Sequence, residues 1–384
     1  MQLSVVILNY NVRSFLMLCL DSVSRAIHGL DAEIIVVDNA SRDDSETYVR
    51  RYFPQVKWIG NQENLGFPKG NNVGVEEAKG KYLLILNPDT VVPESLFHQL
   101  IQRLELRKYG MLSCRLQDGQ GQFLPESKRG IPTPWVAFTK VSGLYKLSKK
   151  KWGQYYASHL DEYQEGEAPI LVGALMLMET SRYRRLGGFD PDCFMYSDDI
   201  DLSYRSLQLG QPNGYCPQVS AIHFKGESTL RDQVYAERFR EAMNYFYRKH
   251  FKPSPVFNAV MHVGAYAFSL KKRFERGAQK APIAQYIYVG KSHARKLQLE
   301  EALGKKIAYY VSASSAMREI TRPATTAVLW DTQDLSYAEI LEVMRVQAYT
   351  GLRHRFLWKN LLIGSDSSQD RGQVVELSEI EKKL

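Results

Sequence analysis

The amino-acid sequence predicts an α/β fold with a mostly parallel sheet. Three observations support this class. Short apolar runs alternate with segments of helical periodicity over the first hundred residues, polar residues directly follow several of these runs, and a second alternation of the same kind begins near residue 286. Ligands of such sheets bind at the carboxyl ends of the strands, so the polar residues found there are the candidates for function.

The first hundred residues are expected to form strands joined by helices. Continuous apolar character predicts strands at 3–8, 33–37, 56–59 and 82–86. Helical spacing of apolar residues predicts helices at 14–26, 41–51 and 69–78, the second with Ser41 as its N-cap. Connections in this order give a parallel sheet with helices on both faces.

The middle of the chain is less regular. Residues 117–168 are basic and rich in Pro, Gly and Tyr, and they contain the run KLSKKKW at 146–152, which is typical of a lid or a binding segment. Apolar character resumes at 170–178, and residues 232–250 show the spacing of an amphipathic helix. We expect this region to complete a first domain at residues 1–252.

A second, smaller α/β pattern occupies the last hundred residues. Strands are expected at 286–289, 307–311 and 326–330, helices at 291–303 and 336–349, and extended segments at 356–363 and 373–377. We therefore expect an amphipathic, basic connecting helix at 253–281 and a small Rossmann-like α/β domain at 282–384.

Composition and charge limit the class of protein. The chain has 384 residues, of which 44% are hydrophobic, and a formal net charge of +8, which is typical of a globular protein with anionic partners. Its four cysteines form no CxxC pair, which argues against a disulfide framework and against a structural zinc site. The N-terminus lacks the basic region and cleavage site of a secretory signal, so we expect a cytoplasmic location.

The sequence contains no run of about 18 apolar residues, so no transmembrane helix is expected. The segment 255–270 comes nearest, but it contains Asn258 and His262, and the basic cluster 271–273 follows it. These features fit a helix lying on the inner face of the cytoplasmic membrane, and they fit equally well a core helix with a solvated basic end.

Two carboxylates directly follow apolar strands. Asp38, in IIVVDNASRD, is placed to accept hydrogen bonds from a nucleoside, although an aspartate at such a position is as often a helix N-cap. Asp89, in YLLILNPDTVV, is placed to hold Mg²⁺ or Mn²⁺ against a diphosphate. The alternative for Asp89 is a turn, because Asn-Pro-Asp is common turn chemistry.

Three further motifs carry polar chemistry. In FMYSDDIDLSYR, Asp198, Asp199 and Asp201 repel one another, so we expect one of the first two to be a general base and Asp201 to cap or support the following helix. His223, in VSAIHFKGEST, is expected at the end of a strand, where it is either a metal ligand or a packed histidine. The segment NLGFPKGNNVG, at 64–74, offers glycines and amides for an anion at a helix N-terminus.

The order of these segments resembles glycosyltransferase family 2, and more narrowly its bacterial rhamnosyltransferase-like branch, which includes galactofuranosyl transferases. The resemblance covers about residues 1–250. It is carried by SVVILNYN, VVDNASRD, NLGFPKGNN, ILNPD, GGFD, MYSDDIDLSYR and IHFKGEST. It implies a GT-A fold, in which one α/β domain contains a nucleotide-binding half and an acceptor half.

The resemblance also implies roles for individual residues. Asp199 would be the catalytic base, with Asp198 beside it, and Asp89, the last acid of the family's DXD motif, would bind the metal together with His223. The nucleotide and donor sugar would contact Leu8, Asn9, Tyr10, Asp38, Asn39, Gly66, Lys69, Asn71, Asn72, Asn87 and Asp89. Because the motif here begins with Asn87, one carboxylate and one histidine remain as protein ligands of the metal.

The reaction implied by the resemblance is an inverting, Mg²⁺- or Mn²⁺-dependent sugar transfer. The donor would be a nucleoside-diphosphate sugar, dTDP-rhamnose in this branch, and the acceptor a saccharide linked to polyprenyl diphosphate in surface polysaccharide synthesis. The basic clusters at 146–151 and 271–273 suit such an acceptor or an anionic membrane surface, and they are explained equally well as solvated faces.

Other interpretations remain open. A sugar-phosphate nucleotidyltransferase would use the same nucleotide site, but no Gly-rich, Arg-Lys loop follows the first strand. A non-catalytic sugar-nucleotide sensor would have no need of the acidic pair Asp198–Asp199. Nucleic-acid binding would explain the positive charge, but no recognised motif supports it.

The C-terminal region loosely resembles the Rossmann-like domain attached to bacterial polyprenyl glycosylphosphotransferases. The resemblance lies in YIYVGKSHARKL and LIGSDSSQDRGQVVEL. Gly290 is followed by Ser292 and Ala294 instead of further glycines, and no acid stands at the ribose-binding place. We therefore do not expect NAD there, and the expected role is regulatory, docking or stabilising.

Overall fold

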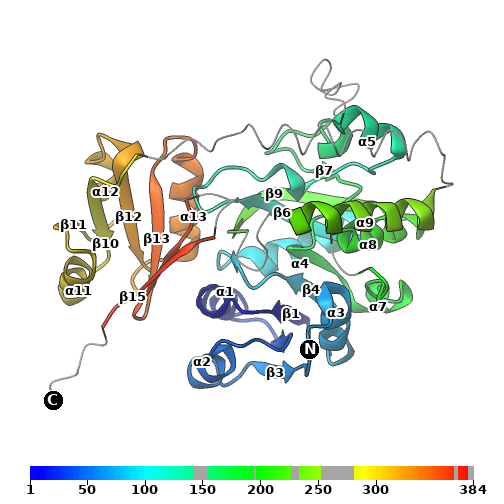
Figure 1. The fold of residues 1–384 in the computed structure, drawn as a ribbon, viewed down its shortest axis with the longest axis horizontal. Coiled ribbons are helices and arrows are strands. Elements are labelled where there is room, and N and C mark those ends of the chain that lie inside the picture. Colours follow the sequence, from blue (N-terminus) through cyan, green and yellow to red (C-terminus); the bar gives the residue numbers. More distant parts are fainter. Residues whose placement is uncertain (142–153, 194–195, 226–232, 252–280, 367–370, 379–384) are drawn as a thin grey trace.

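The computed structural model of the chain contains two β-sheets that pack against each other (Figure 1). It describes residues 1–141, 154–193, 196–225, 233–251, 281–366 and 371–378. Strands β1 to β9 form the first sheet and strands β10 to β15 the second. The α/β class expected from the sequence is confirmed, with a large sheet followed by a smaller one.

The first sheet is mixed in direction. Its strands are β1 (Leu3–Asn9), β2 (Ala32–Asp38), β3 (Lys57–Gly60), β4 (Tyr82–Leu86), β5 (Thr90–Val91), β6 (Met111–Gln117), β7 (Gly166–Glu167), β8 (Leu175–Glu179) and β9 (Asn213–His223). Their order is β3-β2-β1-β4-β8-β6-β9-β5, with β7 paired to β9. β1 to β4 are parallel, β8 is antiparallel to β4 and β6, and β6 is parallel to β9. The carboxyl ends of β1, β2, β4 and β9 therefore lie on one side of the sheet, which we call the carboxyl edge.

Helices cover both faces of this sheet. They are α1 (Arg13–Ala26), α2 (Ser45–Tyr52), α3 (Gly66–Glu76), α4 (Leu96–Arg107), α5 (Pro134–Val141), α7 (Thr180–Arg185), α8 (Asp198–Gln208) and α9 (Gln233–His250), with short 3₁₀ turns η1 (Pro125–Ser127) and η3 (Gln154–Tyr156). Alternate residues of β1 serve the two faces. Leu3, Val5 and Ile7 pack in one core cluster with α1 and α4, whereas Val6 and Leu8 pack in another with residues of α3, α7 and α8.

Most of the expected elements of the first hundred residues are confirmed, and the four strands end within one residue of their predicted bounds. The capping role of Ser41 is wrong, because α2 begins at Ser45. Asp43 Oδ1 accepts a hydrogen bond from Ser45 N at 3.1 Å, whereas Ser41 Oγ accepts hydrogen bonds from Asn9 Nδ2 and Asn11 N. Strand β6 and helix α4 were not expected, and of β9 only the end at His223 was.

The second sheet begins with four parallel strands. Its strands are β10 (Gln285–Val289), β11 (Ile307–Tyr310), β12 (Thr326–Asp331), β13 (Arg353–Trp358), β14 (Leu361–Gly364) and β15 (Gln373–Glu376). The order is β11-β10-β12-β13-β14-β15, in which β14 and β15 are antiparallel to their neighbours. Its helices are α11 (His293–Leu303), α12 (Ala313–Arg318) and α13 (Tyr337–Val346), with a 3₁₀ turn η4 (Pro323–Thr325).

A buried hydrogen-bond network lies at the carboxyl end of β12 in the second sheet. Asp331, at the end of β12, is fully buried and accepts hydrogen bonds from Tyr288 at 2.6 Å and from Arg295 at 2.7 Å. A Cβ atom on Gly290 would lie 2.5 Å from the hydroxyl of Tyr288. These side chains therefore bond to one another at the carboxyl end of β12.

The two sheets share one hydrophobic core. Phe224 lies between Phe15 of α1 and Phe356 of β13, with ring centroids 5.0 and 6.0 Å apart. Trp358 stacks on Phe53, and Tyr337 of α13 is buried in the same cluster. The second sheet is therefore packed firmly against α1, α2 and the ends of β6 and β9.

Polar contacts follow the same interface. Glu94 accepts hydrogen bonds from the N–H groups of Tyr337 and Ala338 at 2.8 and 2.9 Å, and so caps the N-terminus of α13. Arg25 of α1 donates to the carbonyl of Thr332 at 2.6 Å and lies over the ring of Tyr337. Both contacts join residues that are more than 240 positions apart.

Within the described ranges, no helix has the length and apolar character needed to cross a membrane. The expected connecting helix at 253–281, with its apolar segment 255–270 and the basic cluster 271–273, lies outside the described residues apart from position 281. The basic cluster at 146–151 lies outside them as well.

Candidate active site

The carboxyl edge brings residues from distant parts of the chain together. Asn9 and Asp38 end β1 and β2, and their Cα atoms pair in the parallel register. Asn87 follows β4, and its N–H donates to the carbonyl of Ala174, just before β8, at 3.0 Å. His223 ends β9. The ends of these strands and the start of β8 therefore form one continuous line of candidate residues.

Asn9 and Asp38 form a buried polar pair. Asn9 Nδ2 donates to Asp38 Oδ1 at 2.7 Å, and Ser41 N donates to Asp38 Oδ2 at 2.9 Å. Asn9 Oδ1 is buried and has no hydrogen-bond partner in the described part of the chain. Such orphaned acceptors are rare in native proteins and commonly mark a place for a ligand or water. Leu8, which is buried, and Tyr10, which is exposed, flank the pair.

Helix α3 begins at Gly66 and lies against the ends of β1 and β2. Gly66 has a φ of +79°, which glycine adopts without strain, and its N–H donates to Asn64 Oδ1 at 2.9 Å. A Cβ atom on Gly70 would lie 2.5 Å from Leu8 Cδ1 and 3.1 Å from the amide of Asn39. Glycine at position 70 therefore allows the first turn of α3 to reach the carboxyl edge.

The polar side chains at the start of α3 differ in what they contact. Asn39 is buried, and its Nδ2 donates to the carbonyl of Gly66 at 3.1 Å, so Asn39 supports the loop. Asn71 Nδ2 donates to the carbonyl of Phe67 at 2.9 Å, but the buried Asn71 Oδ1 has no partner among the described residues. Lys69 is exposed at the same turn. This turn therefore offers an open acceptor and a cation.

Asn72 contacts other parts of the chain with both ends of its amide. Its Oδ1 accepts hydrogen bonds from the hydroxyl of Tyr183 and from Phe189 N at 3.0 Å, and its Nδ2 donates to the carbonyl of Phe189 at 2.8 Å. These bonds fasten α3 to the loop before α8. Both ends of the Asn72 amide are therefore engaged within the chain.

Asp89 and His223 lie face to face. His223 Nε2 is 3.4 Å from Asp89 Oδ1 and 3.2 Å from Asn87 Nδ2. Asp89 is 4% exposed and His223 is 7% exposed. The backbone fixes their approach, because Thr90 pairs with His223 in the β5–β9 register and Phe224 N donates to the carbonyl of Asp89 at 3.0 Å.

This carboxylate–imidazole pair fits a divalent cation. Neighbouring ligands at about 2.1 Å from an octahedral cation lie about 3 Å apart, which is close to the 3.4 Å between Asp89 Oδ1 and His223 Nε2. Carboxylate oxygen suits Mg²⁺ and Mn²⁺, and imidazole nitrogen is a common ligand of divalent metals. The described residues contain no cluster of three or more metal-competent side chains. A cation held here would take Asp89 and His223 as its ligands among the described residues.

Asp199 is held at the first turn of α8 by two hydrogen bonds to one of its oxygens. Asp199 Oδ2 accepts from Arg129 Nη2 at 2.6 Å and from Gly173 N at 2.9 Å. Asp199 Oδ1 is buried and has no partner among the described residues. Since Gly173 directly precedes Ala174, which bonds to Asn87, the acidic pair and the Asp89–His223 pair are linked through the start of β8.

Asp198 lies beside Asp199 and differs from it in environment. Burial, and next the charge of Asp199, raise the pKa of Asp198 to about 7. Its Oδ1 accepts a hydrogen bond from Asp199 N at 3.0 Å. Near neutral pH, Asp198 is therefore only partly ionised. Close carboxylate pairs commonly avoid two full negative charges in this way.

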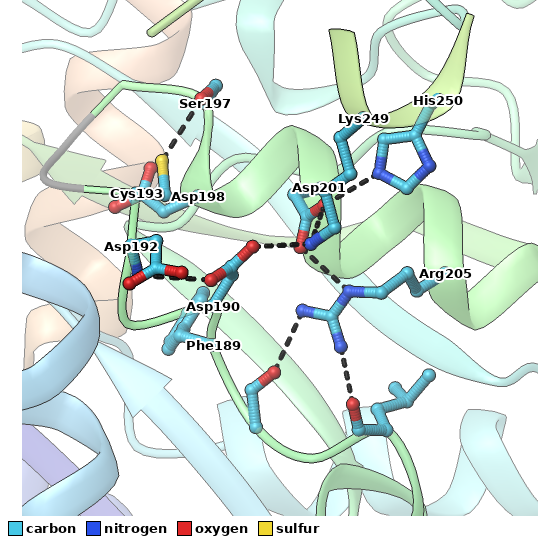
Figure 2. A network of polar contacts seen from close by, with 12 residues as sticks. Phe189, Asp190, Asp192, Cys193, Ser197, Asp198, Asp201, Arg205, Lys249 and His250 are labelled. Carbon is cyan, nitrogen blue, oxygen red and sulfur yellow. Dashed lines mark hydrogen bonds and ion pairs between the residues drawn. The ribbon is translucent and has the colours of Figure 1, made fainter. Parts of the chain in front are cut away.

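Asp201 belongs to a network of charged residues that joins α8 to α9 (Figure 2). Its side chain is 1% exposed and accepts from Arg205 Nε at 2.7 Å, and it lies 2.7 Å from His250 Nε2 and 2.8 Å from Lys249 Nζ. Lys249 also contacts Asp190. The network fixes the first turn of α8, on which the acidic pair lies.

Two residues of this arrangement were not expected from the sequence. Arg129 and Gly173 supply both hydrogen bonds to Asp199 Oδ2, but neither belongs to a motif singled out in the sequence. Arg129 lies within the segment that looked like an irregular lid, and Gly173 within an apolar run. The basic character of residues 117–168 was the one signal that pointed toward Arg129.

Part of this chain is similar in sequence to a known protein family. Residues 4–187 match the model of glycosyl transferase family 2. Three similar proteins are the low-salt glycan biosynthesis hexosyltransferase Agl10 of Haloferax volcanii, an N-acetylglucosaminyl-diphospho-decaprenol L-rhamnosyltransferase of Mycobacterium tuberculosis and the rhamnosyltransferase WbbL of Escherichia coli. They are 26%, 24% and 26% identical to this chain over 58%, 70% and 52% of its length. The matches span 66%, 88% and 76% of these relatives.

Solved structures with a similar fold include the mannosyltransferase PcManGT of Pyrobaculum calidifontis in complex with GDP-Man and Mn²⁺. The two chains are 20% identical, with a TM-score of 0.46 over 72% of this chain and 76% of that one. A second similar structure is that of residues 1–349 of TarS from S. aureus in complex with UDP-GlcNAc, at 16% identity and a TM-score of 0.46 over 71% and 75% of the two chains.

Proposed function

We propose that this chain, of which residues 4–187 match the model of glycosyl transferase family 2, is an inverting, metal-dependent glycosyltransferase with a GT-A-like domain. It transfers a sugar from a nucleoside-diphosphate donor to a hydroxyl group of a saccharide acceptor. The observation that carries this proposal is the line of residues at the carboxyl edge, where the Asn9–Asp38 pair, the Asp89–His223 pair and Asp199 follow one another.

The donor is proposed to bind across the ends of β1 and β2 and the first turn of α3. The buried acceptors Asn9 Oδ1 and Asn71 Oδ1, which have no partners in the described chain, would receive hydrogen bonds from hydroxyl or imide groups of the nucleotide sugar. Lys69 and the N-terminus of α3 favour the negative diphosphate. The remaining donor contacts are proposed for Leu8, Tyr10, Asp38, Asn39, Gly66, Asn87 and Asp89.

Asp89 and His223 are proposed to hold Mn²⁺ or Mg²⁺. When bound, such a cation offsets the negative charge that grows on the departing diphosphate. The chain's own contribution is to keep the carboxylate and the imidazole 3.4 Å apart in a buried place, with Asn87 Nδ2 beside them.

Asp199 is proposed to act as the general base through Oδ1. The acceptor hydroxyl has a pKa far above neutrality, so its proton must leave while the new bond forms. The acceptor oxygen bonds to the anomeric carbon, the bond from that carbon to the diphosphate oxygen breaks with its electron pair, and the proton passes to Asp199. A single displacement from the face opposite the leaving group inverts the anomeric centre.

The transferred sugar is proposed to be L-rhamnose from dTDP-rhamnose, and the acceptor a saccharide linked to polyprenyl diphosphate at a membrane surface. Two similar proteins are rhamnosyltransferases by name, and the name of the mycobacterial one includes an N-acetylglucosaminyl-diphospho-decaprenol acceptor. The net charge of +8 suits an anionic acceptor of this kind.

Turnover on a panel of nucleoside-diphosphate sugars tests the proposal. With Mn²⁺ and a polyprenyl-diphosphate-linked N-acetylglucosamine, the full chain is expected to release nucleoside diphosphate from one donor, and NMR of the product is expected to show an inverted anomeric centre. Asp199→Asn should lower kcat by at least about 100-fold, because a general base contributes about 10²–10⁴-fold. Failure to release nucleoside diphosphate from any donor would overturn the proposal.

Ligand-induced thermal stabilisation separates binding from transfer. A nucleoside diphosphate at 100 times its Kd should add about 2.7 kcal/mol to the free energy of unfolding. We expect this gain to require Mn²⁺, to persist in Asp199→Asn and to disappear in Asp89→Ala. Asp192→Asn, at an exposed residue, is the control that keeps both binding and transfer. Binding without any transfer by the wild type would favour a sugar-nucleotide sensor.

A further inference from the structure

Arg129 is a buried cation in direct contact with the acidic pair. It is 9% exposed, and its backbone is fixed by an antiparallel bridge in which Arg129 N donates to Ile170 O and Ile170 N donates to Arg129 O, both at 2.9 Å. The guanidinium Nη2 donates to Leu171 O at 2.8 Å and to Asp199 Oδ2 at 2.6 Å. The position of Arg129 is therefore set by backbone contacts that do not depend on Asp199.

The contacts of Asp199 are unequal on its two oxygens. Arg129 Nη2 and Gly173 N both donate to Oδ2, whereas Oδ1 is buried without a partner in the described chain. Hydrogen bonds to one oxygen fix the plane and rotation of a carboxyl group and leave the other oxygen available. A general base that must meet an acceptor hydroxyl within hydrogen-bond reach needs such a fixed orientation.

The charges around the pair support the same role. Arg129 faces Asp199 from the segment after η1, Asp198 lies next to Asp199 on α8, and Tyr155 of η3 contacts the guanidinium. Burial would lower the pKa of Arg129, but the charge of Asp199 and hydrogen bonds to Asp199 and Tyr155 raise it above its usual value. The cation therefore persists, and it stabilises the carboxylate form that a base requires.

We infer that Arg129 is a positioning residue for sugar transfer, which holds Asp199 Oδ2 so that Asp199 Oδ1 meets the acceptor hydroxyl. This inference rests on the proposed function. Arg129 contacts the base and none of the reacting atoms, so its effect passes through Asp199. Arg129 would thus take part in the reaction although it lies outside the expected donor, metal and acidic motifs.

Arg129 also connects Asp199 to Tyr155 of η3. Gly130 N donates to the carbonyl of Tyr155 at 3.0 Å, and Tyr155 contacts the Arg129 guanidinium. The strand-like bridge to Ile170 continues to Leu171, whose N–H donates to Ser203 of α8. A shift in residues 128–131 is therefore transmitted to Asp199 by direct contacts.

Two substitutions at Arg129 test the inference in the turnover assay. Arg129→Gln removes the charge and should lower kcat at least 50-fold, while the KM for the donor stays within threefold, because no donor contact is lost. Arg129→Lys keeps the charge without the planar donor group and should recover at least fivefold of that loss.

Arg295→Gln is the matched control, because Arg295 is equally buried and forms a 2.7 Å ion pair with Asp331 in the second sheet. It should lower the melting temperature and leave kcat unchanged. If Arg129→Gln keeps kcat within twofold of the wild type, or if both arginine variants lose kcat in proportion to melting temperature, the inference is overturned. A wild type that transfers no sugar at all overturns the proposed function and the inference together.

Discussion

The imidazole Nε2 of His223 lies 3.4 Å from Oδ1 of Asp89, where strands β9 and β5 meet. If this pair holds the cation, His223→Ala should weaken Mn²⁺ binding by more than the roughly 10–100-fold that loss of an outer contact to a metal ligand costs. Electron paramagnetic resonance of Mn²⁺ with nucleoside diphosphate present measures this affinity. His28→Ala, at an exposed histidine, is the control. Equal Mn²⁺ affinity in the two variants would exclude His223 as a ligand.

Asp198 should make the stability of the protein depend on pH. Burial and the charge of Asp199 raise its pKa from 3.8 to about 7, so between pH 4 and 7 the folded state binds more protons than the unfolded state. This contribution to stability is complete below pH 4 and is lost as pH rises through 7. Asp198→Asn cannot ionise, so its stability relative to the wild type should increase from pH 5 to pH 8.

Chemical denaturation at the two pH values measures this difference, with about 1.4 kcal/mol expected for each unit of pKa shift. Asp192→Asn, on the loop before α8, is the control, because Asp192 is exposed. A difference between wild type and Asp198→Asn that is the same at pH 5 and pH 8 would contradict the prediction.

Asp201→Asn should strongly destabilise the fold. The buried Asp201 carboxylate contacts Arg205, Lys249 and His250, and its removal leaves Arg205 without its counter-charge and His250 without its hydrogen-bond partner, whereas Lys249 keeps Asp190. Breaking a buried ion pair by removing one partner costs about 3–5 kcal/mol. Glu46→Gln, which removes an exposed pair with Arg50, should cost less than about 1 kcal/mol in the same urea titration. Similar losses in the two variants would show that the α8–α9 network adds little stability.

Gly70→Ala should weaken donor binding as well as stability. A Cβ atom at position 70 would lie 2.5 Å from Leu8 and push the first turn of α3 away from the carboxyl edge. Overpacking of this kind costs about 1–3 kcal/mol. Gly74→Ala makes a comparable clash, with Val6 and Val37, one turn further along α3. We expect both variants to unfold at lower urea concentration, and we expect a raised Kd for nucleoside diphosphate, measured by calorimetry, in Gly70→Ala alone.

Glu94→Ala should loosen the contact between the two sheets. It removes the carboxylate that accepts hydrogen bonds from Tyr337 N and Ala338 N, and loss of such a helix cap costs about 0.5–2 kcal/mol. Limited proteolysis should then cut α13 faster than in the wild type. Glu339→Ala, at an exposed residue on the same helix, serves as the control, and equal rates of cleavage in the two variants would refute the prediction.

The strands of the first sheet could be predicted where burial on both faces produces a continuous apolar run, as in β1, β2 and β4. The full length of β9 could not be predicted in this way, although its end at His223 was expected. It contains Pro217, Gln218 and Ser220, and its register with β6 shifts between Cys114 and Arg115. Its place in the sheet is fixed by its partners, and a local pattern carries no information about them.

Some residues of the candidate site could likewise be predicted from the sequence, and others could not. Asp38, Asp89 and His223 could be singled out because the end of a strand in a parallel sheet has a known location. Arg129 could not, since nothing in the sequence distinguishes it from Lys128. Lys128 Nζ donates to the carbonyl of Leu160 at 2.8 Å, whereas Arg129 reaches Asp199. Which of two adjacent cations meets the base depends on how residues 125–131 lie against β8 and α8.

The core shared by the two sheets bears on how this chain could change in evolution. Phe224, the residue after His223, is buried between Phe15 and Phe356, so the end of β9 is shaped by both sheets at once. If recombination replaced the C-terminal sheet with the sheet of another protein, the new sheet would need side chains that pack equally well against Phe224 and Phe15. The two halves are therefore expected to be inherited together and to acquire compensating substitutions in pairs, unlike modules that are exchanged freely through a linker.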